Sequence, residues 1–306
     1  MSSQAVAITA SGDACSKSVE RAYEYCRRTT RVHAKSFYFC AHFLPREKRR
    51  AIYAVYALCR HVDDEVDEAT VRDEASARAA VERWRAQLEA VYRGQRTPAD
   101  FSPVLVAWRD MLTRYRVAQE LPLELMRGVL MDTYRTRYES WDALRVYCYR
   151  VASVVGLMSS EIFGYRGGAE TLACAESLGL AMQLTNILRD VGEDFAMGRV
   201  YLPQDELERF NVSEDQLRRG EVDENFRALM RFEIARARGL YAEAERGIPF
   251  LDADARFTVL LAARLYARIL DEIERADFNV FTRRAHLSFT QKLRAAPRVW
   301  REARRL

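Results

Sequence analysis

The chain has 306 residues, of which 49% are hydrophobic and 30% are charged, with a net charge of +4 at neutral pH. This composition is typical of a folded globular protein rather than a disordered one, and a modest charge spread along the chain argues against nucleic-acid binding. No apolar run approaches the roughly 18 residues that a membrane span requires. Thirteen Gly and seven Pro are few for this length and favour long helices.

The N-terminus and the cysteines bear on the cellular compartment. Residues 1–15 have no basic segment ahead of an apolar one, so they do not resemble a secretory signal, and we expect them to be flexible. The six cysteines are scattered without a CxxC pair, which favours a reducing compartment and argues against thiolate-bound zinc. We therefore predict a cytoplasmic protein.

Helical patterns follow one another along the whole chain. After a first helix at 16–28 and a turn at 29–31, we expect helices over 45–68, 68–93, 103–115, 122–131, 141–164, 178–198, 225–247 and 254–277, and a basic tail helix at the end. No segment has the alternating pattern of a strand, so the sequence predicts an all-α fold.

The helix that begins near residue 178 carries a row of oxygen-bearing side chains. Asn186, Asp190 and Asp194 follow one another at intervals of four residues, which places them on one face of the helix. Most of their neighbours are apolar. Because carboxylates at this spacing repel one another, we expect a cation against them. Mg²⁺ prefers such oxygen ligands and keeps some waters that a phosphate can replace.

A second row lies upstream, in the segment 45–68. Tyr56, Arg60, Asp63 and Asp67 form one stripe of the predicted helix, whose first half is almost wholly apolar. A buried helix seldom carries Arg and Asp on consecutive turns. We therefore expect this stripe to face a polar cavity that contains ions.

Two such rows together predict a site for several divalent cations, Mg²⁺ or alternatively Mn²⁺, that grips a diphosphate and stabilises it as a leaving group. Lys35, Arg60 and Arg189 would add positive charge to the phosphate oxygens. The apolar helices would take a hydrocarbon tail, and small residues around Gly156 would leave room beside their helix. One DxxxD pair is common on surface helices, so the inference depends on there being two rows.

The end of the chain is a basic amphipathic segment. Lys292, Arg294, Arg298, Arg301, Arg304 and Arg305 surround Leu293, Val299 and Trp300. Such a helix is either a solvated tail, which we favour, or a peripheral contact with anionic lipid.

These residues resemble the squalene/phytoene synthase family, the head-to-head prenyl diphosphate synthases. The resemblance runs from Cys26 to the C-terminal helix, and its carriers are HAKSF at 33–37, YALCRHVDDEVD at 56–67, YCYRVASVVG at 147–156, QLTNILRDVGED at 183–194 and RVYLP at 199–203. Segments 227–248 and 269–284 resemble the phytoene branch more than the squalene branch. The resemblance implies one all-helical catalytic domain over residues 16–306, with a class I isoprenoid synthase fold around a central cavity.

Carried over residue by residue, the resemblance implies that Asp63 and Asp67 bind Mg²⁺ on one wall and that Asn186, Asp190 and Asp194 bind it on the other. It implies a substrate-binding set made of His33, Ala34, Lys35, Ser36, Tyr56, Arg60, Gln183, Asn186, Arg189, Tyr266 and Arg283. The catalytic residues would be Arg60, Asp63, Asp67, Asp190, Asp194 and Tyr266. Ala34 stands where some relatives have Ser, so its contact would be through the backbone or absent.

The reaction implied by the resemblance joins two geranylgeranyl diphosphates head to head, through a cyclopropylcarbinyl diphosphate, to give phytoene, the first step of carotenoid biosynthesis. The alternative is a squalene, dehydrosqualene or presqualene diphosphate synthase that uses farnesyl diphosphate, and NADPH is expected only for a squalene synthase. A head-to-tail elongase should show DDxxD motifs, and a terpene cyclase usually has Ser where this chain has Asp190. A non-catalytic helical protein is disfavoured because neither row is lost. Donor chain length and oligomeric state stay open at this point.

Overall fold

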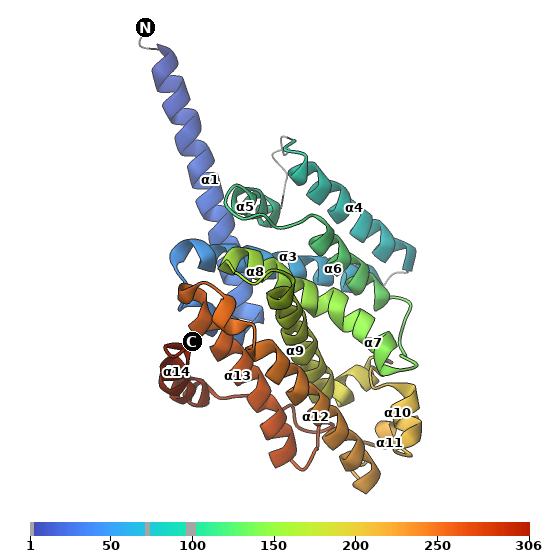
Figure 1. The fold of residues 1–306 in the computed structure, drawn as a ribbon. Coiled ribbons are helices and arrows are strands. Elements are labelled where there is room, and N and C mark those ends of the chain that lie inside the picture. Colours follow the sequence, from blue (N-terminus) through green and yellow to red (C-terminus); the bar gives the residue numbers. More distant parts are fainter. Residues whose placement is uncertain (1–2, 71–73, 96–101) are drawn as a thin grey trace. The chain divides into compact units, whose positions relative to one another are not determined.

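The computed structural model describes residues 3–70, 74–95 and 102–306, and the side chains of 17–68, 74–95 and 102–306. Helices make up most of this chain (Figure 1), and the described residues contain no strand beyond two isolated bridges, Arg137 with Val200 and Tyr165 with Leu251. The predicted all-α class is confirmed. Within the described residues, no helix has the length and apolar character needed to cross a membrane.

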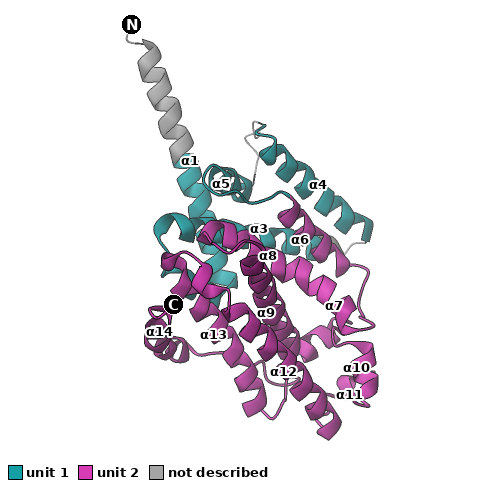
Figure 2. Cartoon of the chain, viewed as in Figure 1, with its two compact units in different colours: residues 1–119 teal, residues 120–306 magenta. Residues whose placement is uncertain are grey.

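The chain divides into two compact units, residues 1–119 and residues 120–306 (Figure 2). The expected division into a flexible segment at 1–15 and one catalytic domain over 16–306 stays a prediction. Residues 1–2 lie outside the described backbone, and the side chains of residues 1–16 lie outside the described side chains.

Unit 1 consists of α1 (Ser3–His33), α2 (Lys35–Ala41), α3 (Arg46–Thr70), α4 (Glu74–Tyr92) and α5 (Pro103–Leu112). Its centre is α3, which packs against α1, α4 and α5. The first half of α3 is buried, including Ile52, Val55 and Leu58, each at most 1% exposed. Burying such aliphatic side chains contributes roughly 1.5–3 kcal/mol each, which is why this apolar run forms the core.

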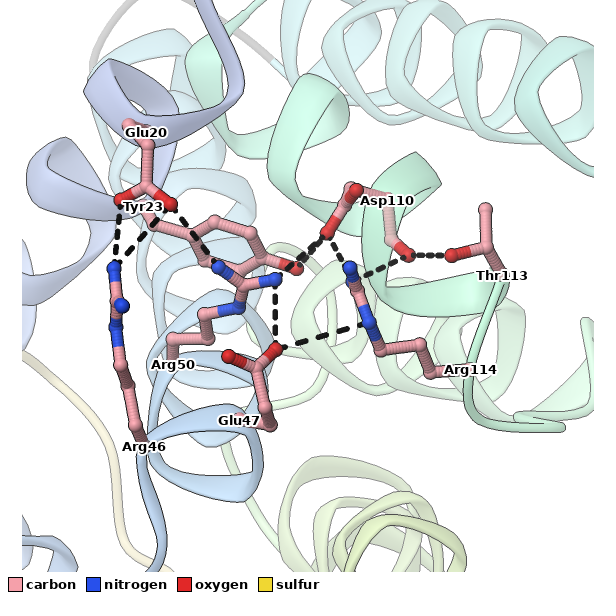
Figure 3. A network of polar contacts seen from close by, with 8 residues as sticks. All are labelled: Glu20, Tyr23, Arg46, Glu47, Arg50, Asp110, Thr113 and Arg114. Atoms are coloured by element: carbon pink, nitrogen blue, oxygen red, sulfur yellow. Dashed lines mark hydrogen bonds and ion pairs between the residues drawn. The ribbon is translucent and has the colours of Figure 1, made fainter. Parts of the chain in front are cut away.

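A charged network joins α1, α3 and α5 beside this core (Figure 3). The Arg50 guanidinium lies 2.7 Å from Glu47 and 3.5 Å from Asp110, and it stacks over the Tyr23 ring at 4.4 Å. The Tyr23 hydroxyl donates a 2.9 Å hydrogen bond to Asp110. Since the Arg50 side chain is only 15% exposed, these partners provide the compensation that a largely buried charge requires.

Unit 2 consists of α6 (Glu120–Met131), α7 (Trp141–Cys148), the π-helical turn η1 (Tyr149–Ser153), α8 (Val154–Phe163), α9 (Ala169–Ala196), α10 (Gln204–Arg209), α11 (Glu214–Arg219), α12 (Glu224–Glu245), the 3₁₀ turn η2 (Ile248–Phe250), α13 (Ala253–Arg275) and α14 (Phe289–Ala303). The long helix α9 packs against α12, α13, α8 and η1. It occupies the middle of the unit in Figure 1 and positions the candidate site.

Two glycines allow α9 to approach the η1–α8 segment closely. A Cβ at Gly179 would lie 2.4 Å from the Ser153 Cα, and a Cβ at Gly156 would lie 2.8 Å from the Ala175 carbonyl oxygen. The small residues around Gly156 do leave room beside their helix, as expected from the sequence, and the backbone of α9 occupies it.

Most helix positions agree with the sequence analysis, and the differences have local causes. The predicted turn at 29–31 is absent, because α1 continues to His33 and the buried Thr30 hydroxyl donates to the Cys26 carbonyl within the helix. The segment 141–164 is helical throughout but contains the π turn η1. Three short helices, α2, α10 and α11, were not expected, since six or seven residues show too little periodicity.

Candidate functional site

Helix α9 brings together five residues predicted for the site. Asn186, Asp190 and Asp194 share one face, the Asn186 amide donates a 3.4 Å hydrogen bond to Gln183, and Arg189 adjoins Asp190. The rest of the helix is held by buried Leu184, Ile187, Leu188 and Val191. The row of polar side chains is thus half-buried on a rigid element.

Two arginines bind the Asp190 carboxylate. Arg189 donates hydrogen bonds of 2.8 and 2.5 Å, and Arg284, from the segment after α13, donates two of 2.9 Å. Burial by itself would raise the pKa of Asp190, but the hydrogen bonds from the two guanidinium groups outweigh it and hold that pKa below its ordinary value. Asp190 is therefore a fully ionised carboxylate with a 14% exposed side chain.

Asp194 lies one turn further along the row and differs electrostatically from Asp190. Burial, followed by the negative charges of Asp190 and Asp132, raises the pKa of Asp194 to about 7, although Arg199 opposes the shift. Arg199 offsets these effects only in part, and a bound cation would further stabilise the ionised Asp194 carboxylate.

Beside Asp194 lies a cluster of tyrosines that the sequence analysis did not identify. The hydroxyls of Tyr147 and Tyr201 donate to the two oxygens of Asp132 at 2.9 and 2.8 Å, and the Tyr147 hydroxyl lies 3.3 Å from that of Tyr201. The rings of Tyr147 and Tyr201 stack at 5.1 Å, and Tyr138 stacks on Tyr201 at 5.8 Å. Asp132 stands alone in the sequence, just after α6, so no spacing could indicate it.

A small pocket adjoins these groups at the end of α9. Its lining is mainly apolar, with Asp194 and Arg199 as its charged members, and consists of Ile187, Val191, Asp194, Phe195, Arg199, Val200, Tyr201, Leu202 and Leu217. The arrangement places the Asp194 carboxyl at the edge of an apolar surface.

In unit 1, Arg60 binds the acidic residues of its own helix. Its guanidinium forms an ion pair with Asp64 and lies 3.5 Å from Asp63, while Asp67 is exposed. The sequence analysis predicted that Arg60 binds a phosphate group, and it did not identify Asp64 as the ion-pair partner of Arg60. Tyr56 is half-buried, with its ring 5.7 Å from that of Phe37.

The remaining predicted residues vary in exposure. His33 and Lys35 are exposed, whereas Ala34 and Ser36 are half-buried where α1 meets α2. Tyr266, on α13, is half-buried and interacts electrostatically with Arg189. Arg283 is exposed, and the next residue, Arg284, is the one that binds Asp190. Adjacent arginines are indistinguishable by spacing, so the sequence could not choose between them.

The donor set on α9 fits a hard cation. Within residues 17–68, 74–95 and 102–306, no three His, Cys, Asp or Glu side chains converge closely enough to hold an ion. Asn186, Asp190 and Asp194 nevertheless present amide and carboxylate oxygens on one face, and burial, followed by the negative charges of Asp190 and Asp132, raises the pKa of Asp194. Carboxylate and amide oxygens are the ligands that Mg²⁺ prefers.

Comparison with known proteins decides the family. The family model "Squalene/phytoene synthase" matches residues 30–291. The chain belongs to the squalene/phytoene synthase family. It is accordingly an enzyme of the prenyl-transferring type, and among the branches of the family it is most similar to phytoene synthases.

Curated relatives cover nearly the whole chain. It is 43% identical to the 15-cis-phytoene synthase of Synechocystis sp., across 94% of this chain and 86% of that protein. It is 40% identical to the chloroplastic phytoene synthase 2 of Solanum lycopersicum, across 91% and 90%.

Solved structures show the same helical fold. A dehydrosqualene synthase in complex with ligand superposes with a TM-score of 0.87 at 29% identity, across 95% of this chain and 99% of that one. Squalene synthase HpnC from Alicyclobacillus acidocaldarius gives a TM-score of 0.77 at 29% identity, across 85% and 96%. The predicted isoprenoid synthase fold is confirmed.

Proposed function

We propose that this protein condenses two molecules of geranylgeranyl diphosphate head to head, through prephytoene diphosphate, to phytoene, the first step of carotenoid biosynthesis. The observation that carries the proposal is the difference between the two sets of relatives. Proteins named phytoene synthase are 39–43% identical to this chain, whereas a dehydrosqualene synthase and a squalene synthase of similar fold are 29% identical.

Mg²⁺, or Mn²⁺ in its place, would be held by Asn186, Asp190 and Asp194 of unit 2 and by Asp63 and Asp67 of unit 1. When bound, the metal would neutralise the diphosphate and stabilise its departure. The half-buried row on α9 supports the first of these ligand sets, since Arg199 offsets the burial and nearby negative charge at Asp194 only in part, whereas guanidinium groups bind Asp190 directly.

The chain's own cations would bind the diphosphates. Arg60 and Arg189 offer planar guanidinium groups, which suit bidentate contact with phosphate oxygens. His33, Ala34, Lys35, Ser36, Tyr56, Gln183, Tyr266 and Arg283 complete the proposed substrate-binding set, and Asp63, Asp67, Asp190, Asp194, Arg60 and Tyr266 its catalytic members. Apolar surfaces such as Ile187 and Val191 at the end of α9 would exclude water from the allylic cation.

We also propose a cytoplasmic location and no requirement for NADPH. All five cysteines within the described side chains are free thiols, which suits a reducing compartment. NADPH would be needed only if the reaction ended in reduction, as in squalene synthesis.

The test is product identification with purified full-length protein. Geranylgeranyl or farnesyl diphosphate is supplied with Mg²⁺, with or without NADPH and with an EDTA control, and hydrocarbons are identified by chromatography and mass spectrometry. We expect phytoene from the twenty-carbon donor without NADPH and none with EDTA. A thirty-carbon hydrocarbon as the main product, or a strict need for NADPH, would reject the proposal in favour of the squalene or dehydrosqualene alternative.

The metal ligands are tested by Asp63→Asn and Asp190→Asn, each of which should reduce turnover at least about 10³-fold while the far-UV circular dichroism stays helical. Matched controls are Glu65→Gln on α3 and Glu208→Gln on α10, which change nearby or exposed carboxylates outside the proposed site. Turnover near wild type in both Asp variants would remove the assignment.

A further inference from the structure

The C-terminal helix α14 presents three different sides. It begins at a capping box, in which Ser288 and Gln291 satisfy each other's backbone groups, so its first turn is well defined. One side, with Lys292, Ala295 and Val299, is buried in unit 2, where α14 packs against α13. Lys292 thus belongs to the buried side and not to the basic surface that the sequence suggested.

The second side is apolar and exposed. Phe289, Leu293 and Trp300 are 66%, 54% and 48% exposed. They are separated by four and seven positions, which at about 3.6 residues per turn places them in one stripe. Large exposed hydrophobic residues of unit 2 are Tyr134, Val146, Met197, Phe250, Phe289, Leu293, Trp300 and Leu306. Four of these eight lie in the last 18 residues, so the stripe is a concentration and not a scattered background.

The third side is basic and borders the apolar stripe. Arg294, Arg301 and Arg305 are exposed and form no ion pair with the described residues, and the Arg304 guanidinium stacks over the Trp300 ring at 4.8 Å. The single acidic residue of the helix, Glu302, is bound by Arg298 at 3.1 Å and by Arg264 of α13 at 3.5 Å. Residues 288–306 contain six basic side chains and one acidic one, so this surface has a strong excess of positive charge.

We propose that α14 docks the protein on an anionic lipid bilayer, with Phe289, Leu293 and Trp300 inserted at the headgroup level and Arg294, Arg301 and Arg305 on the lipid phosphates. An anionic bilayer has negative phosphates at its surface and apolar acyl chains beneath them. An exposed apolar stripe beside a row of arginines is complementary to both layers. Trp is a residue that favours this interface. A second copy of the chain is a poor occupant, because it would oppose one arginine row with another.

The proposal explains why both kinds of residue lie on one helix. A short apolar insertion alone gives weak and reversible binding, and stable attachment requires a second, electrostatic contribution. Each arginine near an anionic surface adds such a contribution, which salt screens. We therefore expect binding that depends on both negative lipid and low ionic strength.

The test is flotation of the full-length protein with vesicles, without any prenyl diphosphate, so that its result is independent of the proposed reaction. Vesicles are phosphatidylcholine alone or with about one third phosphatidylglycerol. We expect partitioning at least about tenfold stronger to the anionic vesicles, weakening with salt, and a blue shift of tryptophan fluorescence that L293S/W300S loses.

Two paired variants separate the apolar and electrostatic contributions. L293S/W300S and R294E/R301E should each reduce binding about tenfold or more, with the same melting temperature as wild type, because no changed side chain is buried. R218E/R219E, at two exposed arginines on α11, alters the net charge equally and should retain binding. Equal binding to both vesicle types, no binding at all, equal loss in R218E/R219E, or dimerisation abolished by L293S/W300S would overturn the proposal.

Discussion

Arg284 binds the carboxylate of Asp190 with two hydrogen bonds of 2.9 Å, although 94 residues separate them along the chain. The contact joins the segment after α13 to the polar row of α9. It also neutralises, without any metal, the carboxylate proposed as a ligand. Any cation that binds Asp190 must therefore compete with this guanidinium group.

Removing Arg284 should strengthen metal binding in the absence of substrate. Arg284→Ala frees both Asp190 oxygens from a half-exposed cation, and we expect the affinity for Mn²⁺ to rise about fivefold, as for the loss of one competing ion pair of about 1 kcal/mol. Electron paramagnetic resonance titration measures the free Mn²⁺. Arg283→Ala is the matched control, since that exposed side chain makes no described contact with Asp190. Unchanged or weaker Mn²⁺ binding in Arg284→Ala would show that the pair does not compete with the ion.

The raised pKa of Asp194 predicts a pH-dependent stability. The folded protein holds this proton up to about pH 7, whereas the unfolded chain releases it near pH 4. The folded state thus binds more protons across this interval, and stability falls as the pH rises from about 4 to 7. Asp194→Asn removes the titration.

In EDTA at pH 8, Asp194→Asn should have a free energy of unfolding about 2 kcal/mol higher than that of wild type. This is roughly half of what a pKa difference of about three between the folded and unfolded states corresponds to, because the carboxyl keeps some solvent contact. At pH 4.5 the two proteins should be nearly equal. Denaturant unfolding at both pH values measures this difference, and Glu208→Gln, at an exposed position on α10, should track wild type. A stability difference that is the same at both pH values would contradict the assignment.

The close approach at Gly179 predicts a severe effect of a single methyl group. A Cβ there would lie 2.4 Å from the Ser153 Cα, and backbone atoms cannot move aside as a flexible side chain can. Gly179→Ala should cost about 3 kcal/mol or more. Gly239→Ala, on an exposed position of α12 where nothing lies within 4 Å, should instead stabilise the protein by about 0.5–1 kcal/mol. Thermal melting compares the two, and equal effects would show that the contact is not limiting.

The hydrogen bond of Tyr147 to Asp132 should contribute to stability. The Tyr147 side chain is buried, and its hydroxyl bonds a charged acceptor at 2.9 Å. Tyr147→Phe should therefore lower the free energy of unfolding by about 1.5–3 kcal/mol. Tyr134→Phe removes a hydroxyl from a residue that is 57% exposed and should change stability by less than about 0.5 kcal/mol. Similar losses in both variants would mean that the Asp132 contact is not the cause.

The sequence was sufficient for the existence of the long helices, though not for where α1 ends or α9 begins, and for the residues that share a face of one helix. Asn186, Asp190 and Asp194 could be grouped because a spacing of four is a local property of the helix. The neighbours of Asp190 and Asp194 from distant parts of the chain could not be found in this way. Arg284 binds Asp190 from the segment after α13, and Asp132, just after α6, acts on Asp194 electrostatically, so both depend on how the helices pack.

The same reasoning explains what the sequence left open. Small residues around Gly156 indicate room beside the helix, but composition does not say whether a ligand or a neighbouring helix occupies it, and here the Ala175 carbonyl does. The sequence analysis placed Lys292 with the arginines on one basic surface, but Lys292 faces inward. Its burial results from the packing of α14 against α13, which the sequence does not show.

The π-helical turn η1 contains one more residue than an ordinary helical turn would need, and each residue rotates a helix by about 100°. This offset lets Tyr147, before the turn, reach Asp132 while Gly156, after it, meets Ala175. Deleting one residue between 149 and 153 would turn one of these two contacts away from its partner. The segment should therefore not tolerate a change of length.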